Sequence, residues 1–214
     1  MKIFLDTANI EHIRYGVKLG VVTGVTTNPS IISREGKVDY HKLVKEICAI
    51  VPGPVSVEVL SQDIDSMITE AKEIATWADN VVIKIPASLQ GLEATSVLSR
   101  QNIKVNFTLC FTLNQALLGA IAGASFVSPF VGRLDDIGED GMKVVADIVE
   151  CFDYYQLPTQ VIAASIRHPY HCLMAAKVGA HIATVPYEVL LQMIRHPLTD
   201  IGIERFRADW KKVM

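Results

Sequence analysis

The sequence predicts a single-domain α/β protein, a (β/α)8 barrel that spans residues 1–214. Short runs rich in β-branched residues alternate with amphipathic segments along the whole chain, and eight such pairs follow one another. The runs are apolar on both faces, as is typical of parallel strands covered by helices. No linker, low-complexity tract or charge run interrupts the series, so nothing in the sequence indicates a second domain.

The first four pairs occupy the amino-terminal half of the chain. Each strand is a short β-branched run, and each helix repeats apolar residues at helical spacing, although Gly91 lies near the start of the fourth helix. The predicted strands are residues 3–6, 21–25, 55–59 and 80–85, and the helices that follow them are residues 10–18, 40–49, 64–77 and 89–98.

The second half repeats the pattern and then extends it by one helix. Its predicted strands are residues 103–108, 125–129, 159–163 and 182–185, and its helices are residues 113–122, 141–155, 170–178 and 188–195. The helix at 141–155 has the longest helical period. A terminal helix is predicted at about residues 199–213, with its helical pattern over residues 204–211, and it places Phe206 and Trp210 on one face.

Parallel strands need crossover connections, which the intervening helices provide. Eight units suit a closed TIM barrel, and 214 residues lie near its lower limit of length. A doubly wound open sheet is the alternative. Its dinucleotide-binding form is disfavoured, because no G-x-G-x-x-G follows the first strand.

Composition excludes several classes of protein. Half of the residues are apolar and a fifth are charged, which is enough to bury a sizeable core. Acids exceed bases by 23 to 20, so the basic footprint of a nucleic-acid-binding protein is absent. Cys48, Cys110, Cys151 and Cys172 are widely spaced, which predicts reduced thiols in a cytoplasmic protein. Asp6 comes too early for the apolar region of a signal peptide.

One stretch tests the expectation that the protein does not enter a membrane. Residues 105–132 contain no charged side chain, and an uncharged segment of this length could span a membrane. The stretch nevertheless contains asparagines, threonines, serines and Pro129. A strand, a short helix and a second strand explain it better, so we expect no membrane contact.

Polar side chains gather where the predicted strands end. The carboxyl ends of barrel strands share one face, which is where TIM barrels place their chemistry. Seven of the eight strands deliver a polar or ionisable group there, and strand eight adds only Thr184 and Tyr187. The groups are Asp6, Thr26, Asn28, Glu58, Lys84, Asn106, Thr108, Ser128, Arg133, Ser165 and Arg167.

Lys84 is the strongest candidate for a catalytic residue. It lies in the apolar run Val81-Val82-Ile83-Lys84-Ile85-Pro86, where burial disfavours the charged ammonium and supplies the neutral amine that Schiff-base chemistry needs. Asp6 and Glu58 suit the proton transfers of that chemistry. The alternative is a structural lysine with these carboxylates as counter-ions, and both interpretations can hold together.

A phosphate-binding subsite is predicted beside this group. Arg133 and Arg167 follow strands six and seven, and Ser165 supplies a nearby hydroxyl. Guanidinium groups and hydroxyls fit a phosphate dianion. The alternative for each arginine is a solvated salt bridge, and Asp135 and Asp136 lie close to Arg133 in the sequence and could supply its partner.

The sequence indicates no metal site. His168 and His171 resemble a ligand pair, but no third ligand is spaced to join them, so a helix start is the better interpretation. The acidic segment 134–141 lacks the spacing of a calcium loop and is interpreted as a solvated loop.

Several long motifs, in order, resemble the short transaldolase family, which includes fructose-6-phosphate aldolase. The resemblance spans nearly the whole chain and includes the ending His196-Pro197-Leu198-Thr199-Asp200. The motifs are Phe4-Leu5-Asp6-Thr7-Ala8-Asn9, Gly24-Val25-Thr26-Thr27-Asn28-Pro29-Ser30, Val82-Ile83-Lys84-Ile85-Pro86, Ser128-Pro129-Phe130-Val131-Gly132-Arg133 and Ala163-Ala164-Ser165-Ile166-Arg167. The resemblance implies a barrel that performs a class I aldol reaction with no metal and no cofactor.

The resemblance also implies roles for individual residues. Lys84 would be the Schiff-base nucleophile, and Asp6 would move the proton of the hydroxyl whose carbon–carbon bond breaks. Glu58, with a water that Thr108 helps to hold, would serve imine formation and hydrolysis. The residues implied to orient the dihydroxyacetone unit are Asn28 and Asn106, supported by Thr26 and Ser128, and Phe130 is implied to contact the substrate beside them. The residues implied to bind phosphate are Arg133, Ser165 and Arg167.

Three positions separate the branches of the family. Transaldolases resemble this chain at Glu58, Asn106 and Phe130, whereas fructose-6-phosphate aldolases have Gln and Tyr where this chain has Glu58 and Phe130, and lack the asparagine. The resemblance therefore implies a transaldolase that moves dihydroxyacetone from sedoheptulose 7-phosphate to glyceraldehyde 3-phosphate, in the non-oxidative pentose phosphate pathway. The alternatives are a fructose-6-phosphate aldolase and a sugar-phosphate-binding barrel without catalysis.

The terminal helix predicts an assembly. Its aromatic stripe needs a surface to bury it, either on its own barrel or on a neighbouring copy. Short transaldolases, which this chain resembles, form pentameric rings that pair into decamers. We therefore expect a homo-oligomer, a decamer of two pentameric rings, with sugar phosphates as the other binding partners.

Overall fold

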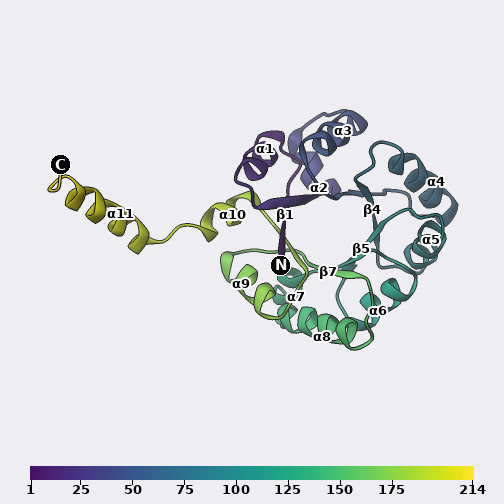
Figure 1. Cartoon of the computed structure of the whole chain (residues 1–214). Coiled ribbons are helices and arrows are strands. Elements are labelled where there is room, and N and C mark those ends of the chain that lie inside the picture. Colours follow the sequence, from purple (N-terminus) through teal and green to yellow (C-terminus); the bar gives the residue numbers. More distant parts are fainter.

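The computed structural model describes residues 1–214 and contains a closed barrel of eight parallel strands in chain order (Figure 1). The barrel closes because β8 pairs with β1. The predicted (β/α)8 barrel is confirmed, and the doubly wound open sheet is wrong. The strands are β1 Lys2–Asp6, β2 Val22–Thr26, β3 Val55–Glu58, β4 Val81–Pro86, β5 Val105–Cys110, β6 Phe126–Pro129, β7 Gln160–Ala163 and β8 Ile182–Val185.

Helices surround the barrel on its outside, and only the last helix of the chain extends away from it (Figure 1). They are α1 Ile10–Lys18, α2 Pro29–Ile32, the 3-10 helix η1 Ser33–Glu35, α3 Tyr40–Ile50, α4 Ile64–Ala75, α5 Leu89–Ser99, α6 Leu113–Ile121, α7 Val131–Asp135, α8 Gly141–Tyr154, α9 Pro169–Lys177, α10 Tyr187–Met193 and α11 Pro197–Trp210. The sequence did not predict α2, η1 or α7, because segments this short show no helical period.

Side-chain caps explain where several helices begin. Asp39, Asp63, Ser88, Thr112 and Asp140 each precede a helix and accept a hydrogen bond from the backbone N–H three residues further on. Such a cap satisfies one of the backbone donors that the first helical turn leaves free. The start of each of these helices is therefore fixed by the side chain that caps it.

Two layers of side chains fill the barrel interior. The apolar layer is a separate core cluster of Phe4, Val82, Phe126, Ile162 and Ile182. Because side chains alternate between the faces of a strand, Asp6 and Lys84 lie on the same inner face as Phe4 and Val82, two residues closer to the carboxyl end. The polar side chains therefore lie directly above the apolar cluster inside the barrel. The main core of 42 buried residues is separate and fills the space between strands and helices.

The uncharged stretch forms β5, α6 and β6, as its polar residues predicted. No helix in the protein is both long enough and apolar enough to cross a bilayer.

Helix α11 leaves the barrel and carries the C-terminus away from it (Figure 1). None of its residues is buried. The sequence placed this helix at about residues 199–213, with its regular pattern from residue 204, and the helix begins slightly earlier, at Pro197, with His196 as its cap. A proline in the first turn is compatible with helix geometry. The apolar period used for the prediction becomes regular only later in the segment.

Candidate active site

A cavity of about 440 Å³ opens at the carboxyl ends of the strands. It is lined by the residues that the sequence predicted for the site, with Asn106 as the exception. The predicted residues that line it are Asp6, Thr26, Asn28, Glu58, Lys84, Thr108, Ser128, Phe130, Arg133, Ser165 and Arg167. The parallel strands therefore bring together side chains that lie up to 161 positions apart, from Asp6 to Arg167.

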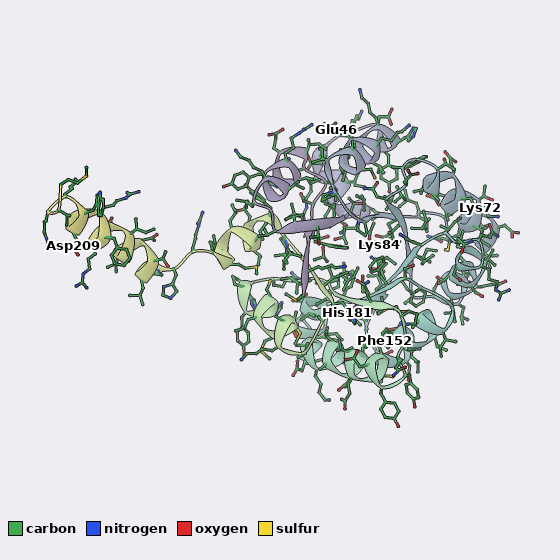
Figure 2. The ribbon with its side chains drawn as sticks, in the orientation of Figure 1. Glu46, Lys72, Lys84, Phe152, His181 and Asp209 are labelled. Carbon is green, nitrogen blue, oxygen red and sulfur yellow. The ribbon has the colours of Figure 1, made fainter.

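Lys84 is held inside the barrel by β4 and is 4% exposed (Figure 2). Its Nζ atom lies 3.2 Å from Oε2 of Glu58, and it donates a hydrogen bond of 3.0 Å to the carbonyl oxygen of Thr27. Glu58 and Lys84 are register partners on β3 and β4, so the sheet itself places them side by side. The expected counter-ion is therefore present, at a distance that also permits proton transfer.

Asp6 lies at the end of β1 in a different electrostatic setting. Its Oδ1 accepts a hydrogen bond of 2.7 Å from Thr26 Oγ1, and the Thr26 hydroxyl also contacts that of Thr184. Because Thr26 gives its only hydroxyl proton to Asp6, Thr184 is the donor in the second bond. Burial raises the pKa of Asp6, and the charge of Lys84 and the Thr26 hydrogen bond only partly oppose it.

Asn106 lies beneath the cavity wall and is fully buried. Its amide donates to Ser56 Oγ at 3.1 Å, and its carbonyl accepts from Ser128 Oγ at 2.7 Å. Asn106 therefore orients Ser128, which does line the cavity. The sequence analysis missed Ser56, although its position two residues before Glu58 on β3 places both on the inner face.

Thr108 and Asn28 each offer a polar group to the cavity. The hydroxyl of Thr108 is buried and has no hydrogen-bond partner in the protein, so it favours a small polar molecule beside it. Asn28 Oδ1 accepts from the backbone N–H of Ile31 and caps α2, which leaves the Asn28 amide donors for the cavity.

The opposite side of the cavity carries two exposed arginines. Arg133, on α7, lies with its guanidinium carbon 5.7 Å from the centre of the Phe130 ring. Arg167 Nη2 lies 2.8 Å from Asp136 Oδ2, so the salt-bridge alternative holds for Arg167. Arg133 forms no salt bridge with Asp135, whose carboxylate lies 3.0 Å from Nε2 of His171.

Ser165 lines the same cavity as the arginines and has an uncommon backbone conformation. Its φ of 58° lies in the left-handed region, which costs free energy for a residue other than glycine. Its carbonyl accepts a hydrogen bond of 3.1 Å from the Gly132 N–H. A Cβ atom on Gly132 would lie 2.4 Å from that carbonyl oxygen, so only glycine permits α7 to come this close.

Sequence reasoning missed Arg34, which also lines the cavity. It belongs to η1, a segment that showed no regular pattern. Its charge is one of the weaker influences that lower the pKa of Asp6. The only signal in the sequence was a basic residue a few positions after a strand end.

No group of three or more histidine, cysteine or acidic side chains is arranged to hold a metal ion. His168 caps α9, as the sequence predicted for this segment, and accepts a hydrogen bond from the His171 N–H. The four cysteines are free thiols.

Comparison with known proteins gives a consistent result. The family model described as transaldolase/fructose-6-phosphate aldolase matches residues 3–214. A probable transaldolase of Dehalococcoides mccartyi is 62% identical over 214 residues, covering 100% of this chain and 99% of the relative. A probable transaldolase of Methanococcus maripaludis is 55% identical over 214 residues, with the same coverage.

Among solved structures, the fold is similar to that of a thiamine phosphate pyrophosphorylase from Pyrococcus furiosus. The TM-score is 0.59, the identity is 16%, and the match covers 86% of this chain and 85% of the other. At this identity the likeness concerns the barrel alone.

Proposed function

The chain belongs to the transaldolase/fructose-6-phosphate aldolase family, and from that premise we propose that it is a class I transaldolase. It transfers a dihydroxyacetone unit from sedoheptulose 7-phosphate to glyceraldehyde 3-phosphate, giving erythrose 4-phosphate and fructose 6-phosphate in the non-oxidative pentose phosphate pathway. The observation that carries the proposal is the buried amine of Lys84, 3.2 Å from a carboxylate oxygen in a cavity lined by hydroxyls and arginines.

The first step joins Lys84 to the ketose. The proton of the ammonium passes to Glu58, and the neutral amine attacks the C2 carbonyl to form a carbinolamine. Glu58 then returns the proton to the departing hydroxyl, which leaves as water and gives an iminium ion. The unpaired hydroxyl of Thr108 is suited to hold that water.

The second step breaks the C3–C4 bond. Asp6 takes the proton of the C4 hydroxyl, and the bonding electrons flow into the iminium to give an enamine on Lys84. The raised pKa of Asp6 makes its carboxylate a stronger base than an ordinary aspartate. Erythrose 4-phosphate leaves, the enamine attacks the aldehyde of glyceraldehyde 3-phosphate, and Asp6 returns its proton. Hydrolysis of the new iminium frees Lys84.

The arginine side of the cavity binds the phosphate that both sugars carry. Arg133 has no acidic partner, so it is available to a dianion. Arg167 exchanges Asp136 for the phosphate, since a single surface carboxylate is a weak competitor for a guanidinium. Ser165 lines the same cavity and adds a hydroxyl donor to this subsite.

Phe130 favours transfer over release of free dihydroxyacetone. Its ring lines the cavity beneath Arg133 and has no hydroxyl proton to give, whereas the aldolase branch has a tyrosine there. The carboxylate of Glu58 also favours transfer, because the aldolase branch has a glutamine at this position. Catalysis, as opposed to simple sugar-phosphate binding, is favoured by Lys84, Glu58 and Asp6 lining one cavity.

The test is incubation with fructose 6-phosphate, with and without erythrose 4-phosphate. We expect sedoheptulose 7-phosphate only when the acceptor is present, and little free dihydroxyacetone in either case. Borohydride added with fructose 6-phosphate is expected to leave a three-carbon adduct on Lys84. Lys104 is the internal control, because it is exposed just before β5 and toward the opposite rim. Steady release of dihydroxyacetone without acceptor would instead assign the aldolase activity, and the absence of any adduct would exclude the Schiff base.

Assembly and location complete the proposal. Helix α11 has no buried residue and exposes a row of apolar side chains, among them Ile201, Phe206 and Trp210. Burying such a row stabilises a helix, and a second copy of the chain offers the surface that its own barrel does not. A decamer of two pentameric rings in the cytoplasm is the assembly we propose, and four unpaired thiols fit a reducing compartment.

Truncation after Pro197, which removes residues 198–214, tests the assembly. Light scattering at micromolar concentration is expected to report a large oligomer for the full chain and smaller species for the truncated one. Trp210→Glu is the matched point variant, since it leaves the chain length intact. A full chain that is monomeric would refute the oligomer and leave the active-site proposal untouched.

A further inference from the structure

His171 is buried behind the arginine side of the cavity and does not line it. Its Nδ1 accepts a hydrogen bond of 3.3 Å from the backbone N–H of Arg167. Its Nε2 lies 3.0 Å from Oδ2 of Asp135, which belongs to α7. One imidazole ring therefore connects the segment that follows β7 to the segment that follows β6.

These contacts define the protonation state of the ring. An Nδ1 that accepts a hydrogen bond carries no proton, so the proton is on Nε2 and is donated to Asp135. Protonating Nδ1 would place two N–H donors face to face at Arg167. Burial lowers the pKa of His171, as do the charges of His168 and Arg167, while the Asp135 carboxylate opposes them. The neutral ring is the form that the surroundings favour.

The connection reaches both arginines of the proposed phosphate subsite. Asp135 also accepts a hydrogen bond from the Gly141 N–H at 3.1 Å, which fixes the carboxylate between His171 and the start of α8. Arg133 lies on the same short helix as Asp135. On the other segment, the His171 bond holds the residue two positions beyond Ser165, whose left-handed backbone needs support from its surroundings.

We propose that His171 is a positioning residue, which aligns the Arg133 and Arg167 segments into one phosphate subsite without touching the substrate. The inference rests on the proposed function, because the subsite itself is part of that proposal. Charge-assisted hydrogen bonds depend on geometry, so a small misalignment weakens the phosphate contact and leaves the distant amine of Lys84 unaffected.

Two substitutions separate the bonds of the ring. In His171→Asn the shorter amide can place an acceptor near Nδ1 and keep the Arg167 bond, while Asp135 loses its donor. In His171→Gln the longer amide can reach Asp135, while the Arg167 N–H loses its acceptor. We expect His171→Gln to raise KM for fructose 6-phosphate roughly fivefold, His171→Asn to raise it less, and kcat to change little. Fructose without phosphate is expected to react equally well with all three proteins.

Sulfate tests the pH dependence, because it remains a dianion throughout the range in which His171 titrates. In the wild type, competitive inhibition by sulfate is expected to weaken as pH falls and the His171 ring gains its second proton. In His171→Asn, this weakening of sulfate inhibition is expected to be absent. His168, Asp135 and Arg167 are the other charged or titratable groups that face the ring, and all remain in the variant. Sulfate inhibition with the same pH profile in both proteins would overturn the inference.

His181 provides the matched control. Its Nδ1 accepts a hydrogen bond of 3.2 Å from the backbone N–H of Val161, the same kind of bond, but His181 lies just before β8, at the amino-terminal end of the barrel. His181→Gln is expected to leave KM for fructose 6-phosphate and sulfate inhibition unchanged. If both histidine variants raise KM equally, the effect is a general loss of rigidity and the inference is wrong.

Failure of the proposed function has a different signature. If wild-type protein binds no sulfate and does not distinguish fructose 6-phosphate from fructose, the phosphate subsite itself is wrong. If Arg167→Ala weakens sulfate inhibition while both His171 variants behave as wild type, the subsite stands and only the role of His171 falls.

Discussion

The two sides of the cavity handle charge in opposite ways. On the β1–β4 side, Asp6, Glu58 and Lys84 are largely enclosed by protein, and each has a hydrogen-bonding or ionic partner. On the β6–β7 side, Arg133 and Arg167 are exposed to solvent. A dry setting strengthens interactions between charges and shifts proton affinities, which suits bond-making groups. A wet setting lets a hydrated phosphate arrive and leave, which suits binding groups.

The scaffolds of the two sides also differ. Asp6, Glu58 and Lys84 belong to strands, whose hydrogen bonds to both neighbours fix their positions. Arg133 lies on the five-residue helix α7, and Arg167 lies in the loop after β7. Substitutions on the strand side are therefore expected to act on the rate of reaction, and those on the loop side on the affinity for phosphate.

The largest effect is expected from Lys84→Met. Because Lys84 is the proposed covalent nucleophile, its removal is expected to lower kcat by about 10⁴-fold or more and to abolish borohydride trapping. The variant is also expected to be less stable, because Glu58 loses the partner of a buried ion pair. Thermal unfolding of Lys84→Met/Glu58→Gln is expected to recover that stability and remain inactive. If the single variant Lys84→Met were active, the catalytic residues could not be those on the β1–β4 side of the cavity.

Asp6→Asn is expected to lower kcat by roughly 10²- to 10⁴-fold, the range for loss of a general acid or base. Its effect on stability depends on pH. Burial raises the folded pKa of Asp6 above the unfolded value near 3.8, so the folded state binds the proton more tightly. Stability from Asp6 is therefore present at low pH and is lost as pH rises through the folded pKa.

The neutral amide of the Asp6→Asn variant does not suffer that loss. Urea unfolding is expected to show the variant at least as stable as the wild type at neutral pH, with the advantage shrinking below the pKa of Asp6. A variant much less stable at neutral pH would mean that the attraction of Lys84 outweighs burial at Asp6.

Arg133→Ala is expected to act on affinity. Loss of one charge-assisted hydrogen bond, about 1.5–3 kcal/mol, corresponds to roughly a 10- to 150-fold rise in KM for phosphorylated sugars. Arg167→Ala is expected to cost less, since Arg167 must first leave Asp136. Steady-state kinetics with free fructose provide the control, and an equal loss with that substrate would indicate a structural role for the arginines.

Thr108→Val is expected to give the smallest effect. The hydroxyl is buried without a protein partner, so replacing it with a methyl group is expected to raise the free energy of unfolding by about 1 kcal/mol. If the hydroxyl holds the water used in imine formation and hydrolysis, kcat falls by about tenfold or less. Chemical denaturation and single-turnover kinetics measure the two quantities, and a kcat equal to that of the wild type would remove Thr108 from the mechanism.

The strand side of the site was largely predictable from the sequence. The alternation of strands and helices predicted the barrel, and the strand ends predicted Asp6, Glu58 and Lys84 as cavity residues. Strand geometry repeats every two residues, and parallel strands end on one face, so position along the chain translates directly into position in space.

The contacts that loop residues make, and the partners of their side chains, were known only from the tertiary structure. It placed Asn106 beneath Ser128, added Arg34 from a segment without a pattern, and paired Arg167 with Asp136. It also showed that His171 contacts both Arg167 and Asp135, which the neighbouring sequence does not indicate. It further showed that no residue of α11 is buried. Most of these residues lie in or beside loops, where the number of residues between two positions does not predict their distance in space. Irregular backbone has no fixed repeat, and its path depends on the elements that it packs against.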